Sequence, residues 1–193
     1  ILTRLTPAQA LVHGVSNLPA TRLMTRKSFA EAGAPAGATA RTNDTFGWAT
    51  GLGVLMIDYD PSAAGTALTR DALVAALMAA APGLAGAGML WWPSASSCIW
   101  AGETELRGIK GQRLYLLVAE ASDIPRAGKA LVQRLWLAGH GQIEVSKSGS
   151  KLERTLVDAS VWQASRLDFA GGAYCGPGLS QRRGEPFLIN PEA

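Results

Sequence analysis

The sequence contains few residues that could form disulfides or bind soft metals. Its 193 residues include two cysteines and two histidines. The cysteines, Cys98 and Cys175, lie far apart and belong to no metal-ligand spacing. A cysteine-ligated metal centre is therefore not expected. A reducing, cytoplasmic compartment is the expected location, and one disulfide between the two cysteines is left open.

The sequence also lacks a long apolar run and a strong charge imbalance. Its most apolar-looking stretch, Gly88–Trp92, is far too short to cross a bilayer. With 18 basic and 15 acidic residues, the net charge of +3 permits a nucleic-acid partner without demanding one. Hydrophobic residues form 48% and charged residues 17% of the chain. This composition excludes a disordered protein and indicates a folded domain that has no membrane as partner.

What the sequence does contain is a series of strand-like and helix-like segments. Apolar runs predict strands at Val54–Ile57, Met89–Trp92, Gln112–Ala119, Gln142–Ser146 and Leu152–Val157, and a hairpin that starts at Cys98. Capping residues and apolar stripes predict helices at Thr69–Ala81 and Ile124–Leu137, and a short one from Thr6 through Val12. The order of these segments predicts an α+β fold with helices packed against a mixed or antiparallel sheet.

We expect three parts along the chain. Residues 1–47 are interpreted as an N-terminal extension that packs on the core, and residues 48–180 as the main domain. Residues 181–193 are expected to form a loosely held C-terminal tail or linker. Because the first residue is Ile1 and not Met, we expect a domain of a longer protein.

The stretch Val54–Pro61 has the clearest chemical content. It is apolar at every position through Ile57, which is typical of a strand covered on both faces, and it ends in Asp58 and Asp60. Side chains alternate along a strand, so these two carboxylates are expected to share a side. Adjacent carboxylates at a buried strand end favour a bound cation such as Mg²⁺ or Mn²⁺. The alternative is that Asp-Tyr-Asp-Pro simply begins a turn.

A third carboxylate, Asp158, follows another predicted strand and would complete a two-metal site with Asp58 and Asp60. Arg113 and Arg166 would then meet the oxygens of a triphosphate, because a planar guanidinium can bind two oxygens at once. The alternative is that Asp158 caps the turn before Val161 and that both arginines are surface charges.

Two of these stretches resemble motifs of the archaeo-eukaryotic primase superfamily, in particular its primase-polymerases. Met56–Asp60 matches the first motif, an apolar strand that ends in Asp-x-Asp. Leu156–Arg166 matches the third, in which such a strand ends in Asp and continues with Val-aromatic and then Arg. The second motif departs from the family, because Arg113 stands where the family has His. In an alternative frame, Ser96–Ile99, the His position holds Cys98.

The resemblance, which runs from about Trp48 to Gly178, implies a primase catalytic core with an RRM-like sheet. It implies template-directed nucleotidyl transfer with Mg²⁺ or Mn²⁺ in the replication of a plasmid, phage or integrated element. The implied partners are a single-stranded DNA template, nucleoside triphosphates and a helicase domain or subunit. The catalytic and metal-binding residues carried over are Asp58, Asp60 and Asp158. The nucleotide-binding residues carried over are Arg113, Arg166, Ser96 and Lys110.

Two other functions remain open. The missing His favours a non-catalytic module that binds single-stranded or origin DNA through a primase fold. A metal-dependent nuclease also uses clustered carboxylates, but it has no use for arginines that face a triphosphate. Four tryptophans are candidates for stacking on template bases, although such residues are more often part of a core. They are Trp48, Trp91, Trp92 and Trp100.

Overall fold

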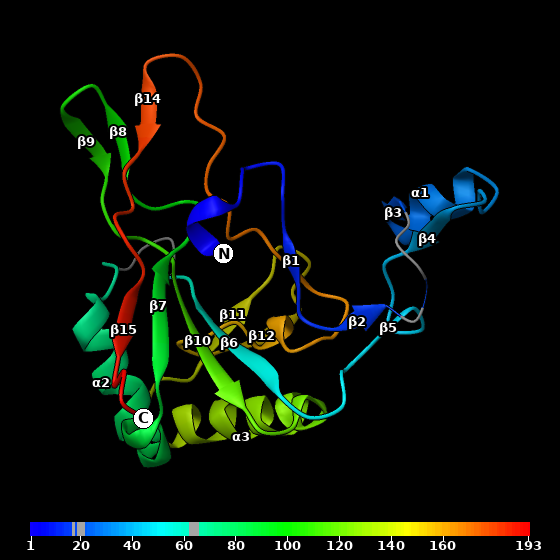
Figure 1. Cartoon of the computed structure of the whole chain (residues 1–193). Coiled ribbons are helices and arrows are strands. Elements are labelled where there is room, and N and C mark those ends of the chain that lie inside the picture. Colours follow the sequence, from blue (N-terminus) through cyan, green and yellow to red (C-terminus); the bar gives the residue numbers. More distant parts are fainter. Residues whose placement is uncertain (17, 19–21, 62–65) are drawn as a thin grey trace.

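The computed structural model describes residues 1–16, 18, 22–61 and 66–193, and it has an α+β fold (Figure 1). The α-helices are α1 (Arg26–Glu31), α2 (Arg70–Ala80) and α3 (Ile124–Leu137). The strands are β1 (Leu11–Val12), β2 (Val15–Ser16), β3 (Arg22–Met24), β4 (Ala38–Ala40), β5 (Phe46–Gly47), β6 (Gly53–Tyr59), β7 (Met89–Pro93), β8 (Ile99–Ala101), β9 (Thr104–Arg107), β10 (Gln112–Val118), β11 (Gln142–Val145), β12 (Lys151–Arg154), β13 (Leu167–Asp168), β14 (Leu179–Gln181) and β15 (Phe187–Ile189).

A four-stranded sheet in the order β15-β7-β10-β6 lies at the centre, and every neighbouring pair in it is antiparallel. Strands β6, β7 and β10 were predicted from apolar runs, and the predicted combination of helices with an antiparallel sheet is confirmed. Val54 on β6 is exposed, so the expected cover on both faces holds only for Leu55–Ile57.

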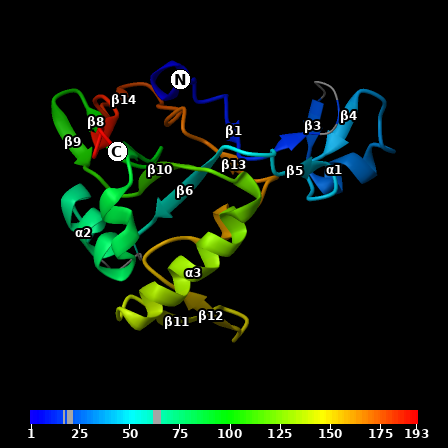
Figure 2. The same cartoon turned by 60° about the horizontal axis from the view of Figure 1, so that its bottom comes forward.

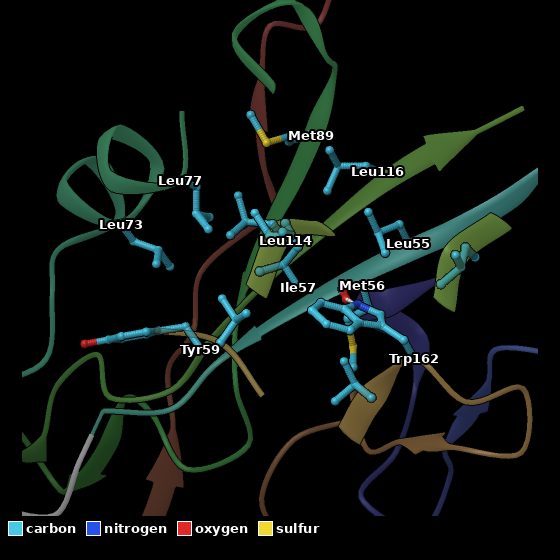
Figure 3. Packing of buried hydrophobic residues seen from close by; sticks show 14 of the residues in the cluster. Leu55, Met56, Ile57, Tyr59, Leu73, Leu77, Met89, Leu114, Leu116 and Trp162 are labelled. Atoms are coloured by element: carbon cyan, nitrogen blue, oxygen red, sulfur yellow. Dashed lines mark hydrogen bonds between the residues drawn. The ribbon is translucent and has the colours of Figure 1, made fainter. Parts of the chain in front are cut away.

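Helices α2 and α3 cover one face of this sheet (Figure 2). Alternate residues of the strands point to that face, among them Ile57 of β6 and Leu114 of β10, and both are fully buried. Leu73 of α2 and Leu135 of α3 pack into the same cluster, part of which is seen in Figure 3. Each such side chain contributes about 1.5–3 kcal/mol by leaving water, so this layer holds the strands in place.

Both long helices begin near the residues that the sequence predicts. The Thr69 hydroxyl accepts a hydrogen bond of 3.2 Å from the Ala72 N–H and so caps α2. Asp123 stands at the corresponding position before α3, but its carboxylate binds Arg126 instead of the helix N–H groups. The helix expected after Thr6 is wrong, because Leu11–Val12 is a strand paired with β13.

The opposite face of the sheet is covered by segments from both ends of the chain. Leu2 and Ala170 pack against Trp92 of β7, whose Nε1–H donates a 3.2 Å hydrogen bond to the Ala170 carbonyl oxygen. The antiparallel pair β1–β13 sets Leu11 opposite Asp168. The N-terminal segment therefore lies against the same face as the residues that follow Trp162.

Two small sheets and a lobe extend from this centre. Strands β14, β8 and β9 form an arm above the ends of β7 and β10 (Figure 1), and the predicted hairpin from Cys98 is its β8–β9 part. The expected hairpin of β11 and β12 is also present, although both strands are shorter than predicted. The unit β3-α1-β4, with parallel strands, projects to the side away from the arm.

The expectation of a loosely held tail from Arg182 onward is wrong. Strand β15 is the edge strand of the central sheet, with Leu188 opposite Leu90 of β7. The guanidinium of Arg70 lies 3.6 Å from the Phe187 ring centroid and so ties this strand to α2. The apolar run Phe187–Ile189 spans only three residues, too short for the alternation that identifies a strand in sequence.

Both cysteines are free thiols, which answers the disulfide question left open by the sequence. Within the described ranges of the chain, none of the helices combines the length and apolar character that a bilayer crossing requires.

Candidate nucleotidyl-transfer site

Three neighbouring strands of the central sheet end side by side. The register pairs Gln112 with Tyr59 on one side and with Pro93 on the other, so Asp60, Gly111 and Ser94 form the next row. A Cβ atom on Gly111 would lie 2.5 Å from Ser94 Oγ and 2.6 Å from Asp60 Oδ1. The polar side chains of the two outer strands thus converge over the glycine between them, which has no side chain to keep them apart.

Asp58 lies on β6, two residues before Asp60, and is opposite Arg113 of β10. The two residues are direct partners in the β6–β10 ladder, and Arg113 Nε is 3.5 Å from Asp58 Oδ1. Their side chains are 14% and 11% exposed, on the sheet face away from α2 and α3. Tyr59 points to the helix face and is buried, as alternation predicts. Arg113 is therefore not the surface charge that the alternative interpretation expected.

Arg113 also contacts Asp168, a residue that sequence reasoning did not select. Arg113 Nη1 is 2.7 Å from Asp168 Oδ1, and the Tyr115 hydroxyl donates a 2.7 Å hydrogen bond to Asp168 Oδ2. The Asp168 side chain is completely buried. The signal in the sequence is the alternation of side chains along a strand. It places Arg113 and Tyr115 on one face of β10, and polar side chains that are buried there require partners.

Asp158 is brought to the same place by a backbone contact with β6. Its N–H donates a 2.8 Å hydrogen bond to the carbonyl oxygen of Asp58. Its carboxylate accepts two 2.8 Å hydrogen bonds, from the N–H and the hydroxyl of Ser160, and so caps a short 3₁₀ turn. Arg166 Nη2 is 3.8 Å from Asp158 Oδ2, and the Arg166 side chain is 40% exposed. Asp158 therefore caps the turn before Val161, and it also lies beside the first motif.

Ser96 and Lys110 lie in two loops that are tied together. The Ser96 hydroxyl is 2.9 Å from that of Ser94, and the Ser97 hydroxyl accepts a 3.0 Å hydrogen bond from the Lys110 N–H. Ser97 also donates a 2.8 Å hydrogen bond to the carbonyl oxygen of Gly111. Cys98, the His position of the alternative frame, is buried at the end of this loop. The loops therefore form one unit beside Asp60.

Burial disfavours the ionised form of Asp58. Burial, and to a lesser degree the charges of Asp60, Asp158 and Asp168, raise its pKa from 3.8 to about 6, although Arg113 opposes the shift. A cation bound here would relieve that repulsion, and an all-oxygen donor set suits Mg²⁺ or Mn²⁺. In the described ranges, however, no three Asp, Glu, His or Cys side chains already stand as one metal-binding group. The residues thus fit such an ion in donor type, and their carboxylates do not already form a complete coordination group.

A groove of about 1210 Å³ opens beside the carboxylates. Its walls include Asp60, Asp158, Ala72 of α2 and Trp136 of α3, together with the β11–β12 hairpin. On that hairpin Arg154 Nε lies 3.0 Å from Glu144 Oε2. The groove therefore has both apolar and acidic lining residues, and it is large enough for a nucleotide-sized ligand.

The four tryptophans considered for base stacking differ in accessibility. Trp91 and Trp92 are buried, and Trp91 Nε1 donates a 2.8 Å hydrogen bond to Gln112. Trp48 and Trp100 are half-buried, and the Arg182 guanidinium lies 4.8 Å from a Trp100 ring centroid. Only these last two offer an accessible ring.

Comparison with protein-family models, with curated proteins and with solved structures gives no match. Functional inference therefore depends on the motifs and on the geometry described above.

Proposed function

We propose that this chain is the catalytic domain of a DNA primase or primase-polymerase that acts in the replication of a mobile element, with a primase-type core. One observation carries the proposal. The aspartates of the first and third motifs, a hundred residues apart in sequence, meet through the 2.8 Å hydrogen bond from the Asp158 N–H to the Asp58 carbonyl oxygen. Asp60 lies next to Asp58, and Arg166 lies beside Asp158.

In this proposal, Asp58, Asp60 and Asp158 hold Mg²⁺ or Mn²⁺, which supplies electrostatic stabilisation of charge on the reacting phosphate. The substrates are nucleoside triphosphates and a single-stranded DNA template, and the bond formed joins a 3′-oxygen to the α-phosphorus as pyrophosphate leaves. Arg166, Lys110 and Ser96 would contact the triphosphate, and the partial exposure of Arg166 supports this role. Trp48 and Trp100 are the remaining stacking candidates, and a helicase domain or subunit is the expected further partner.

The proposal is tested by nucleotide incorporation on single-stranded DNA. Purified protein with Mn²⁺ or Mg²⁺, labelled nucleotides and varied templates is expected to give extended product on a sequencing gel, and EDTA should abolish it. Asp58→Ala combined with Asp60→Ala is the matched inactive variant. Absence of product from the wild-type chain under all these conditions would overturn the enzymatic proposal.

Replacing Arg166 by alanine is expected to weaken nucleotide binding about tenfold, because one charge-assisted contact to phosphate is worth about 1.5–3 kcal/mol and a partly exposed one lies at the low end. The measurement is the dissociation constant of a fluorescent nucleoside triphosphate. Arg126→Ala serves as control, since Arg126 forms an exposed ion pair with Asp123 outside the site. Equal affinity in wild type and Arg166→Ala contradicts the assigned role.

A second function is favoured by the burial of Arg113. With its side chain 11% exposed and paired to Asp168, Arg113 does not present its charge to a triphosphate in this structure. A non-catalytic module that binds single-stranded or origin DNA requires no such contact. For such a module, DNA binding measured by fluorescence anisotropy should not depend on metal. It should also be unchanged in Asp58→Asn, Asp60→Asn and Asp158→Asn.

A further inference from the structure

A small buried cluster between β10, β13 and the N-terminal segment contains polar atoms without hydrogen-bond partners. Among the described residues, the buried side-chain atoms that lack such a partner are His13 Nε2, Arg113 Nε and Nη1, and Asp168 Oδ1. All belong to this one place. Arg113 Nη1 and Asp168 Oδ1 face each other as an ion pair at 2.7 Å that lacks hydrogen-bond geometry. Buried polar atoms without a hydrogen bond are rare in native proteins and call for an explanation.

The distances show how Arg113 divides its charge between two carboxylates. Its guanidinium is 2.7 Å from Asp168 and 3.5 Å from Asp58. Neither contact has hydrogen-bond geometry, since Nε and Nη1 both remain without an acceptor. Arg113 is thus held by charge, mainly by that of Asp168. Burial opposes its charged form, but Asp168, Tyr115 and Asp58 together raise the pKa of Arg113 above its ordinary value.

Asp58 keeps the longer of the two contacts with Arg113, at 3.5 Å, as its compensating charge. Within the described part of the chain, its carboxylate accepts no hydrogen bond, and 14% of the side chain reaches solvent. Were Arg113 to move toward Asp58, it would form a close ion pair and occupy the oxygens that a metal ion needs. The position of Arg113 therefore decides whether Asp58 is available.

We propose that Asp168 is a positioning residue, which draws the Arg113 guanidinium to itself and so keeps the Asp58 carboxylate free to bind a divalent cation. The proposal rests on the proposed function, because it assigns the metal ion to Asp58. It also changes the role of Arg113, which acts within the protein and does not contact the triphosphate.

Asp168 is itself fixed from two directions. The Tyr115 hydroxyl holds Oδ2, and the backbone of β13 is paired with β1, where Leu11 is the direct partner of Asp168. Burial lowers the pKa of His13 and the charge of Asp168 opposes that shift, so His13 also lies near this carboxylate. The N-terminal segment is thereby a structural part of the site and not a separate appendage.

The test measures Mn²⁺ affinity by isothermal titration calorimetry, without nucleotide or template. Asp168→Asn is expected to weaken Mn²⁺ binding about tenfold or more, in the range found when outer partners of metal ligands are changed. In the double variant Asp168→Asn with Arg113→Met, no guanidinium can close on Asp58, and affinity is expected to return to that of Arg113→Met alone. Asp123→Asn is the control, because it removes an aspartate paired with arginine far from the site.

A metal-independent measurement accompanies it. The ¹⁵Nε–¹Hε signal of Arg113, assigned with Arg113→Lys, is expected to shift in Asp168→Asn as the guanidinium changes partner. Tyr115→Phe removes only the hydrogen bond to Asp168, so it is expected to weaken Mn²⁺ binding two- to threefold, and it provides the test if Asp168→Asn does not fold.

The outcomes separate the two proposals. Mn²⁺ affinity that is equal in wild type, Asp168→Asn and Tyr115→Phe overturns the positioning role, whether or not nucleotides are incorporated. A loss in Asp168→Asn that Arg113→Met does not rescue also overturns it, because the loss is then general damage. Rescued Mn²⁺ binding in the double variant, together with a wild-type chain that incorporates no nucleotide, supports the positioning role and overturns the proposed function. A wild-type chain that binds no Mn²⁺ overturns both.

Discussion

Replacing Asp58 by asparagine is expected to stabilise the fold by about 3 kcal/mol at pH 7. The pKa of this carboxyl rises from 3.8 to about 6, first through burial and then through neighbouring carboxylates. Each pKa unit corresponds to about 1.4 kcal/mol between the two protonation states. Asparagine has nearly the same shape and no charge, so it removes the penalty and leaves the Arg113–Asp168 pair in place.

The sign follows from proton binding. Because the folded-state pKa is the higher one, the native protein binds the proton more tightly than the unfolded chain between pH 3.8 and about 6. The free energy of unfolding of the wild type therefore falls as pH rises through this window, and the full cost is present above it. Urea unfolding in EDTA at pH 4 and pH 7 should show a gain for Asp58→Asn only at pH 7.

Asp60→Asn is the matched control, because Asp60 is exposed and its replacement should change stability by less than about 0.5 kcal/mol. Asp58→Asn should at the same time lose more than about 100-fold of its nucleotide incorporation, since changing even an outer partner of a metal ligand costs about 10- to 100-fold. A variant that is both less stable at pH 7 and fully active would contradict the electrostatic description of Asp58.

The second large effect is expected at Gly128 on α3. A Cβ atom at this position would lie 2.2 Å from Cδ2 and Cε3 of Trp162, which rests against the helix. The Trp162 ring is also fixed by a 2.8 Å hydrogen bond from its Nε1–H to the Met56 carbonyl oxygen. Gly128→Ala should therefore lose about 2 kcal/mol of stability, the overpacking cost exceeding the gain of about 1 kcal/mol in helix propensity.

The same substitution should reduce activity, because Trp162 lies four residues after Asp158 and a displaced ring shifts that segment. Gly86→Ala is the control, since the space around Gly86 is open. Combining Gly128→Ala with Trp162→Leu should restore part of the lost stability, measured as a coupling energy in thermal or urea unfolding. If the losses of stability from the two substitutions are strictly additive, there is no steric clash between residue 128 and Trp162.

Sequence reasoning predicted the centre of this fold well and its periphery poorly. Strands β6, β7 and β10 and helices α2 and α3 carry long apolar patterns, and these decide burial directly. Strands β1, β2 and β5 contain two residues each, and they exist because distant partners hydrogen-bond to them. No local pattern of the first fifty residues contains that information.

The candidate site also has a part that could be predicted from the sequence and a part that could not. Asp58, Asp60 and Asp158 could be selected from strand ends, and the structure brings Asp158 to the backbone of Asp58. The partner of Arg113 could not be selected, since Asp168 lies on a two-residue strand whose position is set by Leu11. A buried arginine requires a carboxylate as its partner, but the sequence alone does not identify that carboxylate.

The pairing of Leu11 with Asp168 has a consequence for how the protein is made. Strand β1 leaves the ribosome long before its partner β13, because the central sheet and both long helices lie between them in the sequence. Closing so long a loop is slow, and contacts of this separation form late in folding. The sheet and its two helices can assemble before then, with Asp58 opposite Arg113, whereas the closer carboxylate, Asp168, joins only when β13 pairs with β1. Until then the sheet face that carries Arg113 and Trp92 lacks its cover, and this is the stage at which a folding helper would have most to do.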